Sequence, residues 1–236
     1  MKVQGSNKGK RLLVLAAVEA ELADLRGPLP QNCPVELAAV GCGVVQAAIN
    51  TAAVLKNYQG AFGRSPEAVV FIGSAGSYDH SIPLLTPAVA SSVVLGDTAV
   101  SLGRGYFPEV MTTALHPDAA LAESLLSLDR EAIHSGTFAT PLAITADRRL
   151  GTIIRVELGA KFENLELFGV ASACFSNSAP WTNLSMVTNH IHNLAHKEWN
   201  QNSAQASKFT AAMIISWLSR TGILAPKEEF TGRTER

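Results

Sequence analysis

The stretch that decides the fold is AVVFIGSAG, residues 68–76, in which an apolar run passes directly into a cluster of small residues. Residues 68–72 predict a buried strand, and the glycines and serine after them predict a turn at its carboxyl end. Small residues at such a turn let a ligand approach the backbone and leave amide donors open. They suit a plain structural turn equally well.

Short apolar runs alternate with segments of helical period on both sides of this stretch. Strands are expected at 12–18, 35–40, 87–95 and 181–187, with an extended segment at 133–145. Helices are expected at 19–26, after Gly43, and at 117–128, 164–175 and 197–220. This order predicts one α/β domain with three layers, in which helices cover both faces of a mostly parallel sheet.

Two of the expected helices carry an apolar stripe. The residues of the first stripe are Val45, Ala48, Ile49, Ala52 and Leu55. Those of the second, on the last helix, are Ala206, Phe209, Thr210, Met213, Ile214, Trp217 and Leu218. Such spacing predicts that each helix buries this one face.

Length and composition set limits on the class of protein. The chain has 236 residues, of which 47% are hydrophobic and 17% charged, and its net charge is −1. One core is expected over residues 11–225, with flexible tails at 1–10 and 226–236. Mixed charges give no basic stripe for nucleic acid, and the apolar run at 12–18 is too short to span a membrane. Three scattered cysteines indicate a reducing compartment, so we expect a cytoplasmic protein.

Four motifs lie at strand ends or helix starts, where open α/β sheets bind ligands. They are Glu19–Glu21, Gly41–Gly43, Gly73–Gly76 and Glu163–Glu166. Each has an ordinary structural interpretation: solvated acids in a first helical turn, a tight turn, or an N-cap at Asn164. The glycines at 41 and 43 also begin a dinucleotide fingerprint, but Gln46 stands where its third glycine belongs. Four such features in one chain remain unexplained by structure alone.

The order of these motifs resembles that of the nucleoside phosphorylase/nucleosidase superfamily. The closest resemblance is to futalosine hydrolases and methylthioadenosine/adenosylhomocysteine nucleosidases, and it spans roughly residues 11–222. It implies a nucleoside phosphorylase-like fold with a mixed, partly barrel-like sheet, and hydrolysis of the N-glycosidic bond of a purine-type nucleoside. It also implies a homodimer or larger homo-oligomer, in which the 103–108 loop with Tyr106 and Phe107 is a candidate to reach a neighbouring site. No cofactor, metal, nucleic acid or membrane is implied.

The resemblance assigns roles to individual residues. Glu21 matches the acid that activates the attacking water, and Glu166 matches the carboxylate that binds both ribose hydroxyls. Ser74 matches a small hydroxyl residue near the ribose and the water, and Leu165 replaces a methionine under the sugar. Ile144 replaces the aromatic residue that stacks on the base. Asn164 and Gly76, inside the matching motifs, are also expected to contact the substrate.

Two positions depart from the adenine-cleaving members. Asn189 stands where they have a catalytic aspartate; an amide cannot pass on a proton, but it can donate a hydrogen bond to the departing base. Asparagine here resembles the futalosine hydrolases and the phosphorylases of 6-oxopurines, as does Trp199 downstream, so a hypoxanthine-type base is favoured. Ser185 replaces an arginine that helps to hold the water, which puts the environment of the nucleophile in doubt.

Several alternatives remain open. Phe71 stands where phosphorylases of the superfamily have an arginine for phosphate, which favours water as the nucleophile. Other possibilities are a methylthioadenosine/adenosylhomocysteine nucleosidase, a purine nucleoside phosphorylase, and a nucleoside-binding homologue with impaired catalysis. A dinucleotide-dependent oxidoreductase would rest only on the incomplete glycine pattern. His190, His192 and His196 lack a regular spacing for metal ligands.

Overall fold

The structure is a computed structural model that describes residues 12–30 and 33–224. The tails expected at 1–10 and 226–236 lie outside the described residues. The strands are β1 (Leu12–Ala16), β2 (Val35–Ala39), β3 (Ala68–Ser77), β4 (Pro87–Leu95), β5 (Ala114–Leu115), β6 (His134–Thr140), β7 (Ala160–Glu163) and β8 (Trp181–His190). The helices are α1 (Glu19–Arg26), α2 (Val44–Phe62), α3 (Thr98–Ser101), α4 (Ala119–Leu126), α5 (Arg148–Leu158), α6 (Leu167–Ser176) and α7 (Ala195–Arg220).

The strands form one mixed sheet that closes on itself around β3. This strand pairs in parallel with β1 and β8 and, near its end, antiparallel with β7. β8 continues to β4, β4 to β6, and β6 back to β7, which completes a ring of five strands. The β1–β2 pair extends the sheet on one side. The prediction of a single α/β domain with a partly barrel-like sheet is therefore confirmed.

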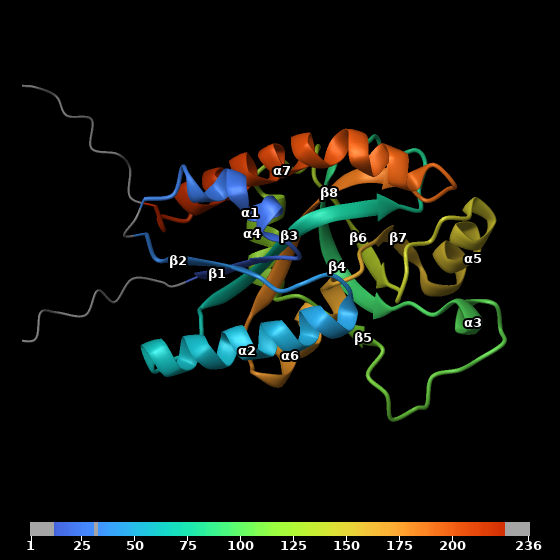
Figure 1. Cartoon of the computed structure of the whole chain (residues 1–236), viewed down its shortest axis with the longest axis horizontal. Coiled ribbons are helices and arrows are strands. Elements are labelled where there is room, and N and C mark those ends of the chain that lie inside the picture. Colours follow the sequence, from blue (N-terminus) through green and yellow to red (C-terminus); the bar gives the residue numbers. More distant parts are fainter. Residues whose placement is uncertain (1–11, 31–32, 225–236) are drawn as a thin grey trace, which may run out of the picture.

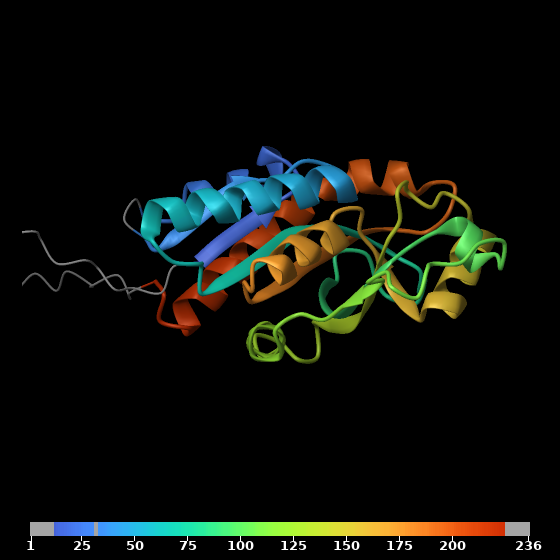
Figure 2. The same ribbon diagram turned by 90° about the horizontal axis from the view of Figure 1, so that it is seen from below.

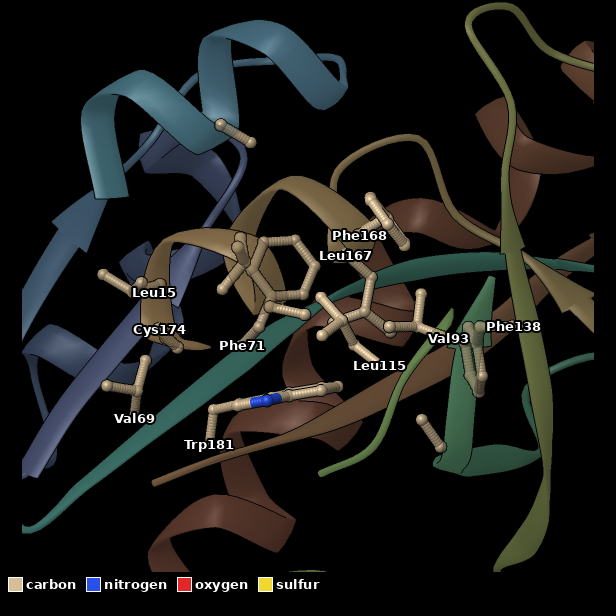
Figure 3. Close-up of a cluster of buried hydrophobic side chains, with 14 of the residues drawn as sticks. Leu15, Val69, Phe71, Val93, Leu115, Phe138, Leu167, Phe168, Cys174 and Trp181 are labelled. Atoms are coloured by element: carbon tan, nitrogen blue, oxygen red, sulfur yellow. The ribbon is translucent and has the colours of Figure 1, made fainter. Parts of the chain in front are cut away.

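Helices cover the sheet on both faces (Figure 1). α1 and α7 lie on one face, where Leu22 and Trp217 pack into a shared core. α2 and α6 lie on the other face, over a second core built around Phe71, Phe138 and Trp181 (Figure 3). β3 contributes to both cores because its side chains alternate between the two faces. β3 is therefore packed against both hydrophobic cores, which hold its carboxyl end in place.

The first predicted stripe, on α2, is wrong in part. Val45 and Ile49 are 64% and 60% exposed, whereas Ala47, Thr51, Leu55 and Tyr58 are the residues that α2 buries. The reason is the close approach of α6, which runs beside α2 (Figure 2). A Cβ at Gly169 of α6 would lie only 2.2 Å from the carbonyl oxygen of Val44. α2 therefore buries the face that includes Ala47 and Leu55, and Val45 and Ile49 lie outside it.

The elements between 133 and 167 also differ from expectation. The extended segment ends at Thr140, and it is followed by α5 and β7, neither of which the pattern predicted. The helix expected from Asn164 begins at Leu167, because Asn164 Oδ1 accepts the backbone N–H groups of Glu166 and Leu167 at 2.9 and 2.8 Å. On α7 the predicted face is buried except at Met213, which is partly buried, and Phe209, which is 43% exposed.

Along the part of the chain that the structure describes, no helix combines the length and the apolar character that crossing a membrane requires.

Candidate functional site

Glu21 lies in the first turn of α1, and its carboxylate points toward the end of β3. Oε2 accepts the backbone N–H groups of Ala17 and Val18 at 3.1 and 3.4 Å, and Oε1 accepts that of Ser74 at 3.3 Å. Burial raises the pKa of Glu21 to about 7, opposed by these amides and reinforced by the charge of Glu166. A Cβ at position 73 would lie 3.2 Å from Oε1, so Gly73 leaves room for the carboxylate. Such a carboxyl group is suited to exchanging a proton near neutral pH.

Glu166 lies just before α6 and is 7% exposed. Its Oε1 accepts the backbone N–H of Gly43 at 2.8 Å. Burial raises its pKa, and the hydrogen bond from Gly43 partly offsets that effect. Gly43 adopts φ +83°, in the region that favours glycine, and it presents its amide at the start of α2. The glycine pattern at 41–43 thus places a backbone amide against the Glu166 carboxylate, and this contact accounts for the pattern without a dinucleotide.

The two carboxylates belong to one site. The side-chain amide of Asn164 donates to the carbonyl oxygen of Ser74 at 3.0 Å, which ties the segment before Glu166 to the turn that contacts Glu21. The charge of Glu166 raises the pKa of Glu21. The thiol pKa of Cys42 is raised by burial and then by the charges of both carboxylates. Glu21 and Glu166 therefore lie near one another in the fold, although 145 positions separate them in the sequence.

Asn189 and Gly76 lie on the adjacent strands β8 and β3 and pair with one another. The hydroxyl of Thr188 donates to Asn189 Oδ1 at 3.0 Å, which leaves the amide nitrogen as the group that faces Gly76. A Cβ at Gly76 would lie 3.1 Å from that nitrogen and 2.7 Å from Ile191. The β3–β8 register shifts at this point, between Ala75 and Gly76, and such irregularities often re-aim side chains beside functional sites.

The structure ties the remaining predicted residues less closely to these side chains. Leu165, between Asn164 and Glu166, is partly buried. Ile144 lies in the loop after β6 and is 55% exposed. Trp199, at the start of α7, donates from Nε1 to Ser74 Oγ at 3.2 Å. Ser74 thus contacts Glu21 of α1, Asn164 between β7 and α6, and Trp199 of α7.

A cavity of about 330 Å³ adjoins Glu21 and Ser74 on the side of α7. Trp199, Ser203 and Ser207 line its α7 wall, and Val18 lies on the α1 side. A second, polar hollow of about 190 Å³ lies beside Tyr78, with Arg148 and Arg155 in its wall. Of the predicted site residues, Glu21 and Ser74 line the first cavity, whereas Glu166, Asn189 and Ile144 do not.

Ser185, which departs from the resemblance, and the nearby histidines His190 and His192 each have a partner within the protein. Ser185 is fully buried, and its hydroxyl accepts the Asn183 side-chain amide at 3.0 Å. His190 contacts the carbonyl oxygen of Ile82, and His192 pairs with Glu198 at 3.0 Å. Within residues 12–30 and 33–224, no three His, Cys, Asp or Glu side chains are grouped to hold a metal ion.

The sequence did not reveal one buried carboxyl group near the site. Glu163 is 5% exposed and accepts the hydroxyl of Tyr78 at 2.5 Å and the backbone N–H of Thr145 at 2.9 Å. In the sequence it marked only the start of a motif, because β7 was not predicted. The signal that could have identified Glu163 was its position as an acidic residue at the end of a short apolar strand, opposite the glycine-rich turn at Gly76.

The fold and the site together define a class: a single-domain α/β protein with two carboxylates at the carboxyl ends of its central strands. The chain belongs to the phosphorylase superfamily, since the sequence model of that family matches residues 24–219.

Individual relatives agree with this family. A 5′-methylthioadenosine/S-adenosylhomocysteine nucleosidase of Marinomonas sp. is 26% identical over 217 residues, which cover 84% of this chain and 88% of the relative. The fold is similar to that of a Neisseria meningitidis nucleosidase of the same name, solved with methylthio-immucillin-A (TM-score 0.78, 18% identity, 89% and 99% of the two chains). It is also similar to Helicobacter pylori futalosine hydrolase (TM-score 0.77, 18% identity, 91% and 100%).

Proposed function

We propose that this protein hydrolyses the N-glycosidic bond of a purine-type nucleoside, with futalosine or a related 6-oxopurine nucleoside as the preferred substrate. The observation that carries the proposal is the proximity of two buried carboxyl groups: Glu21 accepts the Ser74 amide, the charge of Glu166 raises its pKa, and Asn164, two residues before Glu166, donates to the Ser74 carbonyl oxygen. The names of the curated relatives support nucleoside cleavage in general.

In the proposed reaction each of the three polar side chains has a separate role. Glu166 would bind the two ribose hydroxyls through charge-assisted hydrogen bonds, with Leu165 and Asn164 beside the sugar. Glu21 would take a proton from water while the oxygen of that water bonds to the anomeric carbon and the bond between this carbon and the base breaks. Asn189 would donate to the purine's imidazole nitrogen, where negative charge develops, with Gly76 and Ile144 next to the base.

Water is the favoured nucleophile. Phe71, where a phosphate-binding arginine would be expected, is completely buried in the core. Ser185 is uncharged and bonded within the sheet, so neither position offers a cation to a phosphate anion. The cavity beside Glu21 is lined by Ser203 and Ser207 and also by Lys208, so the preference for water rests on positions 71 and 185.

The test is a panel assay of released base. Futalosine, methylthioadenosine and inosine are incubated with the purified protein, with and without inorganic phosphate. Cleavage without phosphate, fastest for a hypoxanthine nucleoside, is expected. Strict dependence on phosphate would replace the proposal with a phosphorylase, and no turnover together with nucleoside binding would indicate an impaired homologue.

A second candidate is a methylthioadenosine/adenosylhomocysteine nucleosidase, which the names of the curated relatives favour. The base-contacting position separates the two. Asn189→Asp is expected to shift preference toward adenine nucleosides, because an acid can protonate the imidazole nitrogen whereas the amide cannot. An unchanged preference would count against the placement of the base beside Asn189.

A further inference from the structure

The polar hollow of about 190 Å³ beside Tyr78 has no role in the proposed reaction. One of its walls is a single face of α5, where side chains at i, i+3, i+4 and i+7 lie in a row. The residues of this wall are Arg148, Gly151, Thr152 and Arg155. The opposite wall is the turn after β3, residues 78–81. A Cβ at Gly151 would lie 2.6 Å from Ile191 Cγ2, so the glycine allows α5 to lie against the segment that follows β8.

The lining of the hollow carries more positive than negative charge. Its acid, Asp79, is already bound: Oδ2 pairs with Arg155 Nη2 at 3.1 Å, and Oδ1 accepts the amide and the hydroxyl of Ser81 at 3.1 and 2.7 Å. Within the described part of the chain, the guanidinium of Arg148 has no ion pair and no hydrogen bond. The N–H donors of Arg148 are therefore available to a ligand.

The surroundings of His80, on the wall opposite α5, show the same excess of positive charge. Its Nε2 contacts the carbonyl oxygen of Ile191 at 3.2 Å, and its ring stacks on that of His190 with centroids 4.9 Å apart. Burial lowers the pKa of His80, and the hydrogen bond to Ile191 opposes this effect. Neighbouring groups that carry or can gain positive charge lower the pKa further; these are His190, Arg148 and His192. An anion in the hollow would act in the opposite direction.

A tetrahedral dianion suits the size and the charge of the hollow. The volume of about 190 Å³ is several times the share of one water molecule in the liquid, about 30 Å³. Arginine binds such oxyanions through paired N–H donors. Arg148 and Arg155 lie two helical turns apart, roughly 10 Å along the axis of α5, so their long side chains can approach one anion from both ends of the hollow.

We propose that the hollow between α5 and the turn after β3 is a second binding site, which takes a phosphate group between Arg148 and Arg155. This chemistry is shared by free phosphate and by the phosphate monoester of a small molecule. The described lining includes none of Glu21, Glu166 and Asn189, so the site is separate from the region assigned to the nucleoside. The inference therefore goes beyond the proposed hydrolysis and does not depend on it.

Calorimetric titration at constant ionic strength tests the site. Inorganic phosphate, sulfate and glycerol 3-phosphate are titrated into the wild type, Arg148→Gln and Arg149→Gln. Each anion is expected to bind the wild type, and Arg148→Gln is expected to weaken each about 10-fold, the effect of one charge-assisted hydrogen bond. Arg148 has no partner within the described chain, so its removal should leave the fold intact. Tighter binding of glycerol 3-phosphate than of phosphate would support the site and identify a monoester as the ligand, and the reverse order would support it with the free anion as the ligand.

Arg149→Gln is the matched control. It removes the same charge from the adjacent position of α5, which is exposed and lies outside the lining. Because exposed charges at a distance are screened by salt, the affinities should stay within about twofold of the wild type. Equal weakening by Arg148→Gln and Arg149→Gln would mean a general attraction by surface charge and would overturn the proposal, as would a wild type that binds none of the anions.

Asp79→Asn gives the opposite expectation. It removes the negative charge of the lining, keeps an oxygen for the Ser81 donors and releases Arg155, so each anion should bind severalfold more tightly. A variant that fails to fold cannot produce such a gain. An affinity that is unchanged by both Asp79→Asn and Arg148→Gln would place the anion elsewhere, for example beside Glu21, and would overturn the proposal.

The titrations also separate this inference from the proposed function, because they require no turnover. If the anions bind as expected but no nucleoside is cleaved, the proposed reaction fails while the second site stands. If nucleosides are cleaved and the wild type binds none of the anions, the second site fails while the reaction stands.

Discussion

At the residue scale, Glu21 and Glu166 are both buried carboxyl groups, but their surroundings differ. Glu21 receives three amides and adjoins a cavity, whereas Glu166 is bound to Gly43 at the start of a helix. Different environments allow two chemically identical groups to act as a base and as a binding group.

Glu21→Gln tests the first of these roles. Removing the base is expected to lower kcat by 10²–10⁴-fold, the usual contribution of general base catalysis, with little change in nucleoside affinity. Glu19→Gln is the control, because Glu19 lies in the same helical turn but pairs with Arg26 at the surface. Steady-state kinetics and equilibrium binding measure the two effects, and substantial turnover by Glu21→Gln would remove this residue from the mechanism.

Glu166→Ala tests the second role. Loss of the carboxylate should weaken nucleoside binding as well as turnover, because the ribose hydroxyls lose their acceptor before and during the reaction. The comparison that matters uses the nucleoside and its 2′-deoxy analogue. The wild type should discriminate against the analogue, and Glu166→Ala should discriminate less; equal discrimination would place the ribose elsewhere.

The pKa of Glu21 predicts how activity depends on pH. A general base must be deprotonated, and burial raises the pKa of this group from 4.5 to about 7. kcat/KM should therefore rise about tenfold per pH unit below 7 and level off above it. A profile from pH 5.5 to 9, with circular dichroism at each end to show that the fold persists, measures this. Activity that falls as pH rises through 7 would contradict the assignment.

The individual site residues were predictable to different degrees. Glu21, Ser74 and Glu166 belong to local motifs, and the resemblance carried by the order of these motifs predicted that they lie near one another. Glu163 was not predictable, because its meaning depends on strand pairing with Gly76 and on donors from Tyr78 and Thr145, all of them distant in sequence. Local patterns show which residues carry charge, but only the fold shows which charges are buried together.

At the element scale, the contact between α2 and α6 helps to position the Glu166 carboxylate. Gly169 of α6 lies against the carbonyl oxygen of Val44, and the preceding residue, Gly43, donates its amide to Glu166. Periodicity predicted α2 and the burial of Leu55, but it wrongly placed Val45 and Ile49 on the buried face, because the pattern does not show where the neighbouring helix α6 packs. β7 escaped prediction because it has only four residues, whereas α5 carries apolar residues at helical spacing, a signal that the sequence did contain.

Gly169→Ala should disturb both stability and binding. The added methyl group would lie 2.2 Å from the Val44 oxygen, so α2 must shift, at a cost of roughly 1–3 kcal/mol. The same shift moves the Gly43 amide, so KM should rise. Gly60→Ala, in α2 with open space around its Cβ position, is the control and should be neutral or slightly stabilising. Urea denaturation and steady-state kinetics measure the two effects, and identical behaviour of the two variants would argue against a positioning role for this contact.

At the scale of the whole molecule, exposed apolar side chains predict self-association. Val45 and Ile49 on α2, with Tyr106 and Val110 in the loop after α3, are 60–96% exposed. Apolar surface of this kind commonly marks an interface. We expect a homodimer or larger homo-oligomer by light scattering, and Val45→Glu combined with Ile49→Glu should weaken it. A wild type that is monomeric at micromolar concentration would contradict this expectation.

Global stability should also report the cost of keeping Glu21 buried. Its pKa is about 7 in the folded protein and near 4.5 in the unfolded chain, so between these pH values the folded state binds more protons. The contribution of Glu21 to the unfolding free energy is therefore fully present below pH 4.5 and is lost as pH rises to about 7. Glu21→Gln cannot titrate, so the stability of the wild type relative to this variant should fall by roughly 1–3 kcal/mol over that range. Urea unfolding of both proteins from pH 4.5 to 8 measures the difference. A constant difference would mean that Glu21 is solvated in the folded state, and its suitability as a base at neutral pH would lose its physical explanation.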